Sequence, residues 1–396
     1  MLIVGVGLYV GNVVLGNKAA EEIERLIGPK FQEMGINYGD LSVSPLGGTV
    51  TMSGVLSDGL SVESITAGVD HADLIALMED PNNTLKSLDL DVLNFRAGDD
   101  DGREGIDIGQ GSFSIEGNLD AREFQRNPEA FMASLMAQED VDVSISGNDI
   151  TVRARELKRE LGLPSETMVL KSMMFDVDKD GDSFDVQMMA DAPMVGQMDI
   201  IAQGRDGALT LLKGDMSIVG LEAEDMLLSM GNCYFEIDAA IGLDDPNNWE
   251  SSNWVQEMIA AGEDFSWSIQ ASDLVVGGRG MAGMARQFGL DAEGLNVDNF
   301  ASDASFDGKE FQTELTLHTN VGNIDAEIDM TADDFDNMDN PESVNFRTLE
   351  IELSDLVPAL SQQVRAIGAA FMEPDGDNGF RFSYEGSAAG LSKFGF

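Results

Sequence analysis

Hydrophobic and polar residues alternate along much of this chain, and a period of two places successive side chains on opposite faces of a strand. The clearest segments have apolar residues at Val141, Val143 and Ile145; at Phe184, Val186 and Met188; at Phe311, Leu315 and Leu317; at Ile324, Ala326 and Ile328; and at Leu349, Ile351 and Leu353. Asp, Ser, Thr and Glu hold most positions between them. The pattern predicts antiparallel sheets with one apolar and one solvated face.

Other segments repeat apolar residues at three and four positions, which predicts amphipathic helices. We expect helices at Arg122–Ala137, Ala154–Leu161, Ala223–Met230, Trp254–Ala261, Met281–Phe288 and Leu356–Phe371. What covers the apolar sheet face decides its use. These helices are enough to cover most of it as an ordinary core, whereas an uncovered part would form an apolar groove suited to an acyl chain.

The N-terminus contains an uncharged apolar segment, a predicted helix and a predicted hairpin, in that order. Leu2–Leu15 has no charged residue, Ala19–Met34 has the helical period, and INYGDLSVSPLGGTVTMSGV from Ile36 predicts two strands joined by a tight turn. Leu2–Leu15 would reach only about 21 Å as a helix, too short to span a membrane. Three interpretations stay open: the end of a signal anchor that starts upstream, a poorly formed signal peptide, or a buried element of the fold.

The strongest internal signal is a repeat. FMASLMAQEDVDVSISGNDITV from Phe131 aligns without a gap on VQEMIAAGEDFSWSIQASDLVV from Val255, and the pairs that match include Asp149/Asp273. A short helix, a hairpin and another strand follow in each copy, and Ser-Asp-Leu-Val from Ser272 recurs near the C-terminus from Ser354. We therefore predict an α+β fold of tandemly duplicated antiparallel sheet units with short helices, after an N-terminal membrane-entry segment. The predicted divisions are 1–18 (membrane anchor or signal-anchor remnant), 19–120 (helix, hairpin and degenerate first unit), 121–219 (repeat unit 1), 220–332 (repeat unit 2) and 333–396 (partial C-terminal unit).

Charge narrows the range of partners. The chain of 396 residues has 72 acidic and 23 basic residues, a net charge of −49, so nucleic acid is excluded as a partner. A hydrophobic fraction of 43% is enough for real cores. A solvated surface adapted to salty surroundings is the simplest explanation of the acidic excess.

One motif suggests a metal. DVDKDGDSFDVQ from Asp176 begins like a calcium loop, with Asp176, Asp178, Asp180 and Asp182 as the ligands. The match then fails, because Gln187 stands where the bidentate Glu is expected and the duplicated copy keeps only the Asp-Gly turn. A hairpin turn explains both copies, so Ca²⁺ is the alternative and we expect no cofactor. Another acidic loop, GDDDG from Gly98, is read first as a turn.

Catalytic constellations are not recognisable in the sequence. The two histidines are His71 and His318, and the one cysteine, Cys233, is read as a small buried hydrophobe. We expect no enzyme activity, although a carboxylate pair acting on glycans stays open as an acid-rich hydrolase.

The N-terminal order of apolar segment, amphipathic helix and hairpin resembles the start of AsmA-like bacterial envelope proteins. The resemblance covers about the first 55 residues and rests on INYGDLSVSPLGGTVTMSGV. It implies anchoring in the bacterial inner membrane with the bulk of the chain in the periplasm, and long sheets whose apolar surface handles phospholipid or acyl chains.

We therefore expect a non-catalytic, membrane-anchored periplasmic protein that binds or scaffolds, with lipid handling through an apolar sheet face. The alternative is a secreted or surface protein of a salt-adapted bacterium that binds cations or glycans through acidic loops. The sequence does not identify a protein partner.

Overall fold

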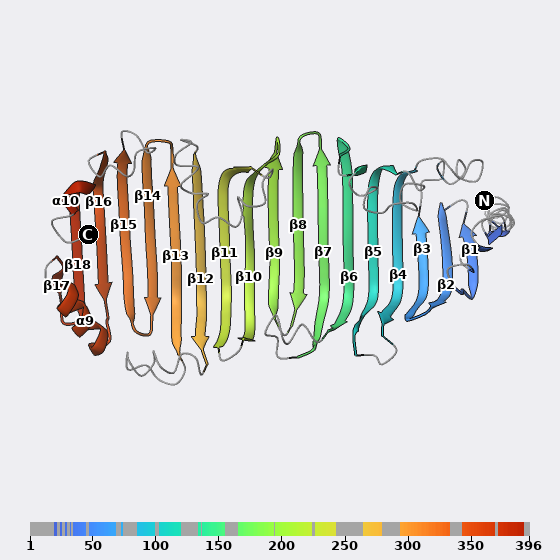
Figure 1. Ribbon diagram of the computed structural model, residues 1–396, viewed down its shortest axis with the longest axis horizontal. Coiled ribbons are helices and arrows are strands. Elements are labelled where there is room, and N and C mark those ends of the chain that lie inside the picture. The colour runs from blue at the N-terminus through green and yellow to red at the C-terminus, as the bar shows by residue number, and fades with distance from the viewer. Residues whose placement is uncertain are drawn as a thin grey trace, which may run out of the picture. The chain divides into compact units, whose positions relative to one another are not determined.

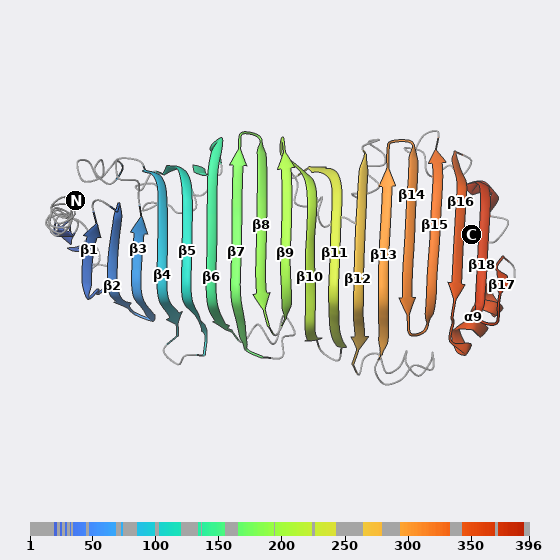
Figure 2. The same cartoon turned by 180° about the vertical axis from the view of Figure 1, so that it is seen from behind.

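The computed structural model describes residues 20–21, 24–25, 28–29, 32, 35–44, 47–68, 73, 85–99, 103–119, 134–135, 137–154, 165–193, 195–223, 226–242, 264–278, 294–332, 343–368 and 371–391. The chain divides into two compact units. The N-terminal unit comprises residues 1–161 and 165–193, and the C-terminal unit comprises residues 162–164 and 194–396. Figures 1 and 2 show the strands from opposite sides.

The N-terminal unit is an antiparallel meander in which each strand pairs with the next. Its strands are β1 (Asp40–Ser44), β2 (Thr49–Ser57), β3 (Leu60–Gly68), β4 (Leu85–Gly98), β5 (Gly105–Leu119), β6 (Asp140–Arg153), β7 (Thr167–Asp180) and β8 (Ser183–Ala192). Turns as short as Gly181–Asp182 between β7 and β8 enforce this order, because a tight hairpin can join only antiparallel neighbours.

The C-terminal unit continues the same pattern. Its strands are β9 (Gly196–Arg205), β10 (Ala208–Ala223), β11 (Met226–Gly242), β12 (Phe265–Gly277), β13 (Leu295–Phe306), β14 (Glu310–Thr319), β15 (Gly322–Ala332), β16 (Val344–Ser354), β17 (Glu373–Asp375) and β18 (Gly379–Ser387). Each pairs antiparallel with its successor up to β16, which pairs with β18, and the short β17 pairs with β18.

The prediction of antiparallel sheet is confirmed, but strands dominate more than α+β implies. The helices described from end to end are α9 (Pro358–Gly368) and α10 (Ala388–Leu391). The expected helix Leu356–Phe371 is confirmed as α9. The expected helix Ala223–Met230 is wrong, because these residues end β10 and begin β11, where pairing with neighbouring strands overrides a local helical period.

Several expectations fall largely on residues outside the described part. Ser134 and Leu135 are helical within the expected helix Arg122–Ala137, and Ala154–Leu161, Trp254–Ala261 and Met281–Phe288 lie almost entirely outside it. Leu2–Leu15 also lies outside, whereas the described residues of Ala19–Met34 are helical. In the described part of the chain, no helix is both long and apolar enough to cross a membrane. The predicted hairpin is confirmed as β1 and β2, with Ser44 opposite Thr49.

The predicted repeat units contain the same succession of strands, β6 to β9 and β12 to β15. Asp149 and Asp273, aligned by sequence, both adopt a left-handed backbone, with φ of 53° at each. Each faces a glycine on the preceding strand: a methyl group added to Gly109 would lie 3.0 Å from Asp149 Cβ, and one added to Gly231 would lie 2.9 Å from Asp273 Cβ. The repeated device is therefore a kink inside a strand. The domain divisions themselves stay a prediction.

The kink at Asp149 keeps one face of β6 apolar along its whole length. Before it, the buried residues Val141 and Val143 occupy odd positions, whereas after it the buried residue is Ile150. A methyl group on Gly147 would lie 2.8 Å from Ile150 Cδ1, so Ile150 leans over the face to which Val143 belongs. Before Asp149 the odd-numbered residues of β6 lie on the apolar face, and after it the even-numbered residues do. One left-handed residue therefore changes which positions face the core, while the apolar face stays on the same side of the sheet.

Candidate functional site

The apolar face of the N-terminal unit is closed in one place. Ile115, Val143 and Val177 are lateral neighbours on β5, β6 and β7, and each is at most 9% exposed. They pack in one core cluster with Leu135, which is fully buried. A row of apolar strand residues under a covering side chain is an ordinary core.

The next row on the same face is not closed. Phe113, Ile145, Phe175 and Met188 are lateral neighbours on β5 to β8. Phe113 and Phe175 are only partly buried, and Ile145 is 36% exposed, against 6% for Val143 two residues before it. Large apolar side chains are therefore left accessible beside the core, as in a binding surface for an apolar ligand.

The C-terminal unit has the same kind of face with more aromatic residues. Ala239, Phe265, Phe306, Phe311, Met330 and Phe346 form one lateral row across β11 to β16. The Phe265 and Trp267 rings stack at 5.7 Å, and Phe265 and Phe306 lie at 5.4 Å. At the C-terminal end the face is closed, because Phe380 and Phe382 are buried and Arg365 of α9 lies 5.8 Å from the Phe380 ring.

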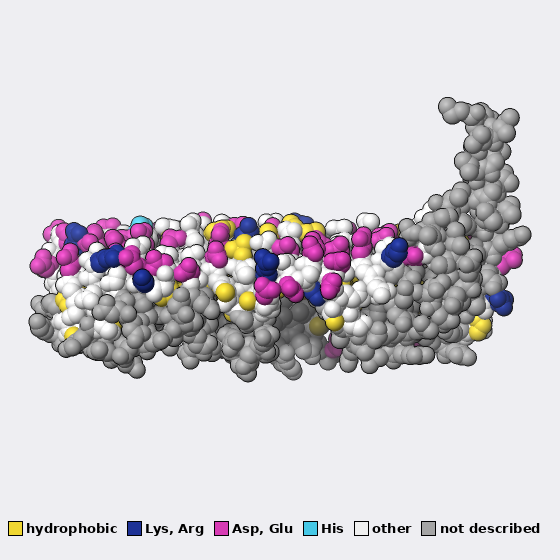
Figure 3. All heavy atoms as spheres, turned by 90° about the horizontal axis from the view of Figure 1, so that it is seen from above, with side chains coloured by type: hydrophobic (Ala, Val, Ile, Leu, Met, Phe, Trp, Pro, Cys, Tyr) yellow, Lys and Arg dark blue, Asp and Glu magenta, His cyan; other side chains and the backbone are white. Residues whose placement is uncertain are grey.

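The opposite face carries carboxylates in lateral rows. Glu116, Asp142, Asp178 and Asp185 are register partners across β5 to β8, and Asp303, Glu314, Glu327 and Glu350 are partners across β13 to β16. Figure 3 shows acidic side chains gathered along the described strands, with few basic ones among them. Hydrogen bonding and repulsion from Asp142 raise the pKa of Asp178, with burial and Asp185 acting in the same direction.

The four predicted calcium ligands do not form a loop. Asp176, Asp178 and Asp180 lie at alternate positions of β7, and Asp182 lies in the two-residue turn after it. Alternate strand residues are spread along the strand, so they do not converge on one ion. In the residues that the structure describes, no group of three or more His, Cys, Asp or Glu side chains is arranged to hold a metal. What the structure brings together instead is Asp178 with Asp142 and Asp185 of the adjacent strands.

A depression with a volume of about 310 Å³ lies at one end of β3 to β6. It is lined by Gly59, Leu60, Ser61, Arg96, Ala97, Gly98, Asp99, Glu104, Asp107 and Arg153. Ser61, Arg96, Asp107 and Thr151 are register partners, so the strand pairing itself gathers the first three of these lining side chains.

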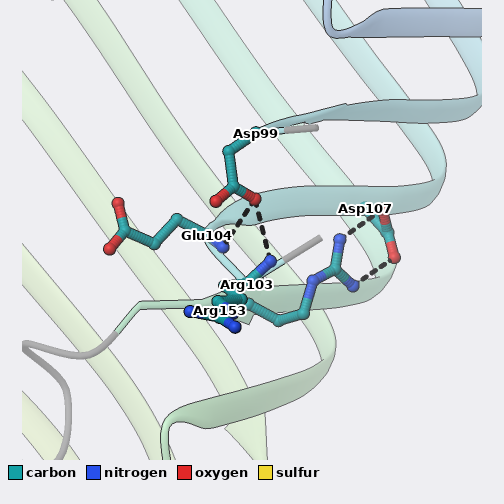
Figure 4. A network of polar contacts seen from close by, with 5 residues as sticks. All are labelled: Asp99, Arg103, Glu104, Asp107 and Arg153. Carbon is teal, nitrogen blue, oxygen red and sulfur yellow. Dashed lines mark hydrogen bonds and ion pairs between the residues drawn. The ribbon is translucent and has the colours of Figure 1, made fainter. Parts of the chain in front are cut away.

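An ion pair fixes one wall of this depression (Figure 4). Arg153 Nη1 donates to Asp107 Oδ2 at 2.6 Å and Nη2 donates to Oδ1 at 3.1 Å. The hydrogen bond from Arg153 lowers the pKa of Asp107, and charge attraction to Arg153 and Arg96 adds to this effect. The Arg153 Nε atom is buried and has no hydrogen-bond partner among the described residues.

Asp99 and Glu104, on either side of residues 100–102, line the other wall. Asp99 Oδ1 accepts hydrogen bonds from the backbone N–H groups of Arg103 at 2.8 Å and Glu104 at 3.0 Å. This bonding is typical of an Asp that stabilises a turn. Residues 100–102 of the GDDDG segment lie outside the described part of the chain. Sequence reasoning missed Arg96, Asp107 and Arg153, because they join only through pairing of separate strands.

The remaining reactive side chains form no catalytic group in the described part of the chain. His318 Nε2 lies 3.4 Å from Asp325 Oδ1 on a half-exposed face, and His71 lies outside the described residues. Burial, followed by repulsion from Asp215, raises the pKa of the Cys233 thiol, which makes it a poorer nucleophile.

Comparisons with known proteins return no match: no protein-family model, curated protein or solved structure is similar to this chain.

Proposed function

We propose that this protein is a non-catalytic component of the bacterial envelope that binds the acyl chains of lipids along the apolar face of its sheets. The observation that carries the proposal is the partial exposure of Ile145 in a row of large apolar residues that adjoins a closed core. An extended acyl chain lying across the strands could contact Phe113, Ile145, Phe175 and Met188 in turn. Each buried CH₂ group would contribute roughly 0.8 kcal/mol.

The proposal includes anchoring in the inner membrane with the bulk of the chain in the periplasm. It is supported by the uncharged segment Leu2–Leu15 and by the AsmA-like order of helix and hairpin that follows it. The acidic face is compatible with this role, since carboxylates repel an anionic membrane surface and would leave the apolar face as the side that meets lipid.

The test is native mass spectrometry of the full chain purified in mild detergent, with extraction and identification of bound lipid. We expect phospholipid or fatty acid at a defined stoichiometry, and a large loss of it in Ile145→Asp. Ser144→Asp is the matched control, because Ser144 precedes Ile145 and points to the opposite face. A ligand-free wild-type mass, or equal loss in both variants, would contradict the proposal.

The second candidate is a secreted or surface protein of a salt-adapted bacterium that binds cations or glycans through acidic loops. The lateral carboxylate rows favour it, because like charges directly opposite in a sheet repel one another and dissolved cations screen them. Thermal melting in KCl and in CaCl₂ distinguishes a general adaptation to salt from specific cation binding. Stabilisation that depends only on ionic strength indicates salt adaptation, and stabilisation by micromolar calcium indicates specific cation binding.

A further inference from the structure

The depression at the end of β3 to β6 has no part in acyl-chain binding. Its side chains Ser61, Arg96 and Asp107 form one lateral row with Thr151, and Thr151 follows the kink at Asp149 on the face opposite Ile150. The depression therefore opens on the polar face of the N-terminal unit. An inference from it stands independently of the proposed function.

Glycine residues allow the backbone to pack closely at this end of the strands. Gly98 and Gly105 are register partners, and Gly105 is also opposite Arg153, so two neighbouring positions beside the arginine carry no side chain. A methyl group on Gly98 would lie 2.5 Å from the Glu104 carbonyl oxygen, and one on Gly59 would lie 2.8 Å from the Gly98 carbonyl oxygen. Larger residues at Gly98 and Gly59 would strike backbone, and the volume of about 310 Å³ is at the lower end for ligand pockets.

The charges argue against a simple ion as the ligand. Two arginines and three acidic residues line the depression, so negative charge is in excess and a free anion would be repelled. A bare cation would be repelled by Arg96 and Arg153 in the same lining, and their charge is only partly offset because Arg153 already binds Asp107 in two hydrogen bonds. Neither kind of ion uses the mixture of donors and acceptors.

A neutral ligand rich in hydroxyl groups does use it. A hydroxyl both donates and accepts, so neighbouring hydroxyls can accept from guanidinium groups and donate to carboxylates of the same lining. The ion pair holds Arg153 in one orientation, and Arg96 on β4 is exposed and lies beside Asp107. Preorganised donors and acceptors reduce the entropy that a ligand loses on binding.

We propose that this depression binds one saccharide unit, with Arg96 and Arg153 donating to hydroxyl oxygens and the carboxylates accepting from hydroxyl groups. Arg96 is the residue to test first. Its side chain is exposed and is attracted to Asp107 by charge, and it makes no hydrogen bond to another described residue. Its replacement would leave the Arg153–Asp107 pair in place.

The test is saturation-transfer NMR and titration of the full chain with glucose, galactose, mannose and N-acetylglucosamine. We expect saturable binding of at least one sugar, weakened roughly tenfold or more in Arg96→Gln, since one charge-assisted hydrogen bond is lost. Arg347→Gln is the matched control, because Arg347 also pairs with a carboxylate, Glu310 at 2.5 Å, but lies outside the depression. The control should bind as the wild type does.

Three results would overturn the proposal. The first is that none of the four sugars binds, and the second is that Arg96→Gln and Arg347→Gln bind equally well. The third is that inorganic phosphate or CaCl₂ binds at the depression with higher affinity than every sugar. Weaker binding of that ion to Arg96→Gln or Glu104→Gln would place it at the depression. Circular dichroism of each variant establishes that lost binding is not lost folding.

Discussion

Two neighbouring rows of the N-terminal unit share a face, a set of strands and a residue type, yet differ in exposure. Ile115, Val143 and Val177 are buried in contact with the cluster that holds Leu135, whereas Ile145 in the next row is 36% exposed. Both rows obey the same alternation. The difference teaches that the strand pattern defines which face is apolar, and that the covering side chains decide whether a given row is core or accessible surface.

The largest expected effect comes from removing the cover. Leu135→Ala should lower the free energy of unfolding by about 3 kcal/mol, because it leaves a cavity over the closed row. Ile145→Ala in the accessible row should cost about 1 kcal/mol, since part of that side chain is already in water. Urea denaturation of both variants measures the contrast, and equal losses would mean that the two rows do not differ in packing.

The kink at Asp149, which keeps Ile150 on the same face as Val143, gives the next prediction. Asp149→Ala should lower stability by roughly 1 kcal/mol, because alanine tolerates the left-handed backbone less well than Asp does. Asp149→Gly should be as stable as the wild type or more so. Asp273→Ala and Asp273→Gly should have the same effects on stability as the corresponding variants of Asp149. Thermal melting tests this, and a Gly variant as unstable as the Ala variant would show that the Asp side chain, rather than the backbone, is what matters.

The ion pair on the polar face predicts a pH dependence. The folded-state pKa of Asp107 is lowered, so its stabilisation is present above the usual Asp value of 3.8 and is lost as pH falls through the lowered value. Arg153→Gln should lower stability modestly at pH 7, because both side chains are partly exposed and water screens their attraction. Chemical denaturation from pH 7 to pH 3 should show the two proteins converging in acid; a constant difference would exclude this linkage.

The smallest expected effect comes from the carboxylate row. The folded-state pKa of Asp178 is raised, so its contribution favours folding at low pH and is lost as pH rises through the raised value. Asp178→Asn should therefore stabilise the protein slightly at pH 7, because it removes a like charge beside Asp142. Thermal melting at pH 7 measures the change, with Asp182→Asn in the turn as the control. A destabilised Asp178→Asn would indicate that the carboxylate serves another contact.

The sequence predicts the sheet well because alternation is a local signal. The segments around Val143, Val186 and Ala326 are all strands. The helix expected at Leu356–Phe371 from its apolar period is observed as Pro358–Gly368, where a proline at the first helical position marks a start that the period did not locate. The expected helix at Ala223–Met230 fails because a helical period over a few residues cannot compete with two long paired strands. The kink leaves a trace in Gly147-Asn148-Asp149, where the alternation reverses.

The candidate sites are less accessible to sequence reasoning. Arg96, Asp107 and Arg153 come from three strands and meet only through their register, which no local pattern records. Alternation predicts the apolar face, but the exposure of Ile145 depends on what covers each row. The predicted calcium loop shows the converse error, since acidic spacing in Asp176–Asp182 fits both a metal loop and a hairpin.

The most direct test of acyl-chain binding is photocrosslinking in bacterial cells with p-benzoylphenylalanine at Ile145 or at Ser144. These adjacent positions lie on opposite faces of β6, so they compare the apolar and polar faces within one strand. We expect lipid adducts, identified by mass spectrometry, at position 145 and few at position 144. Adducts at neither position, or equally at both, would contradict lipid binding along the apolar face.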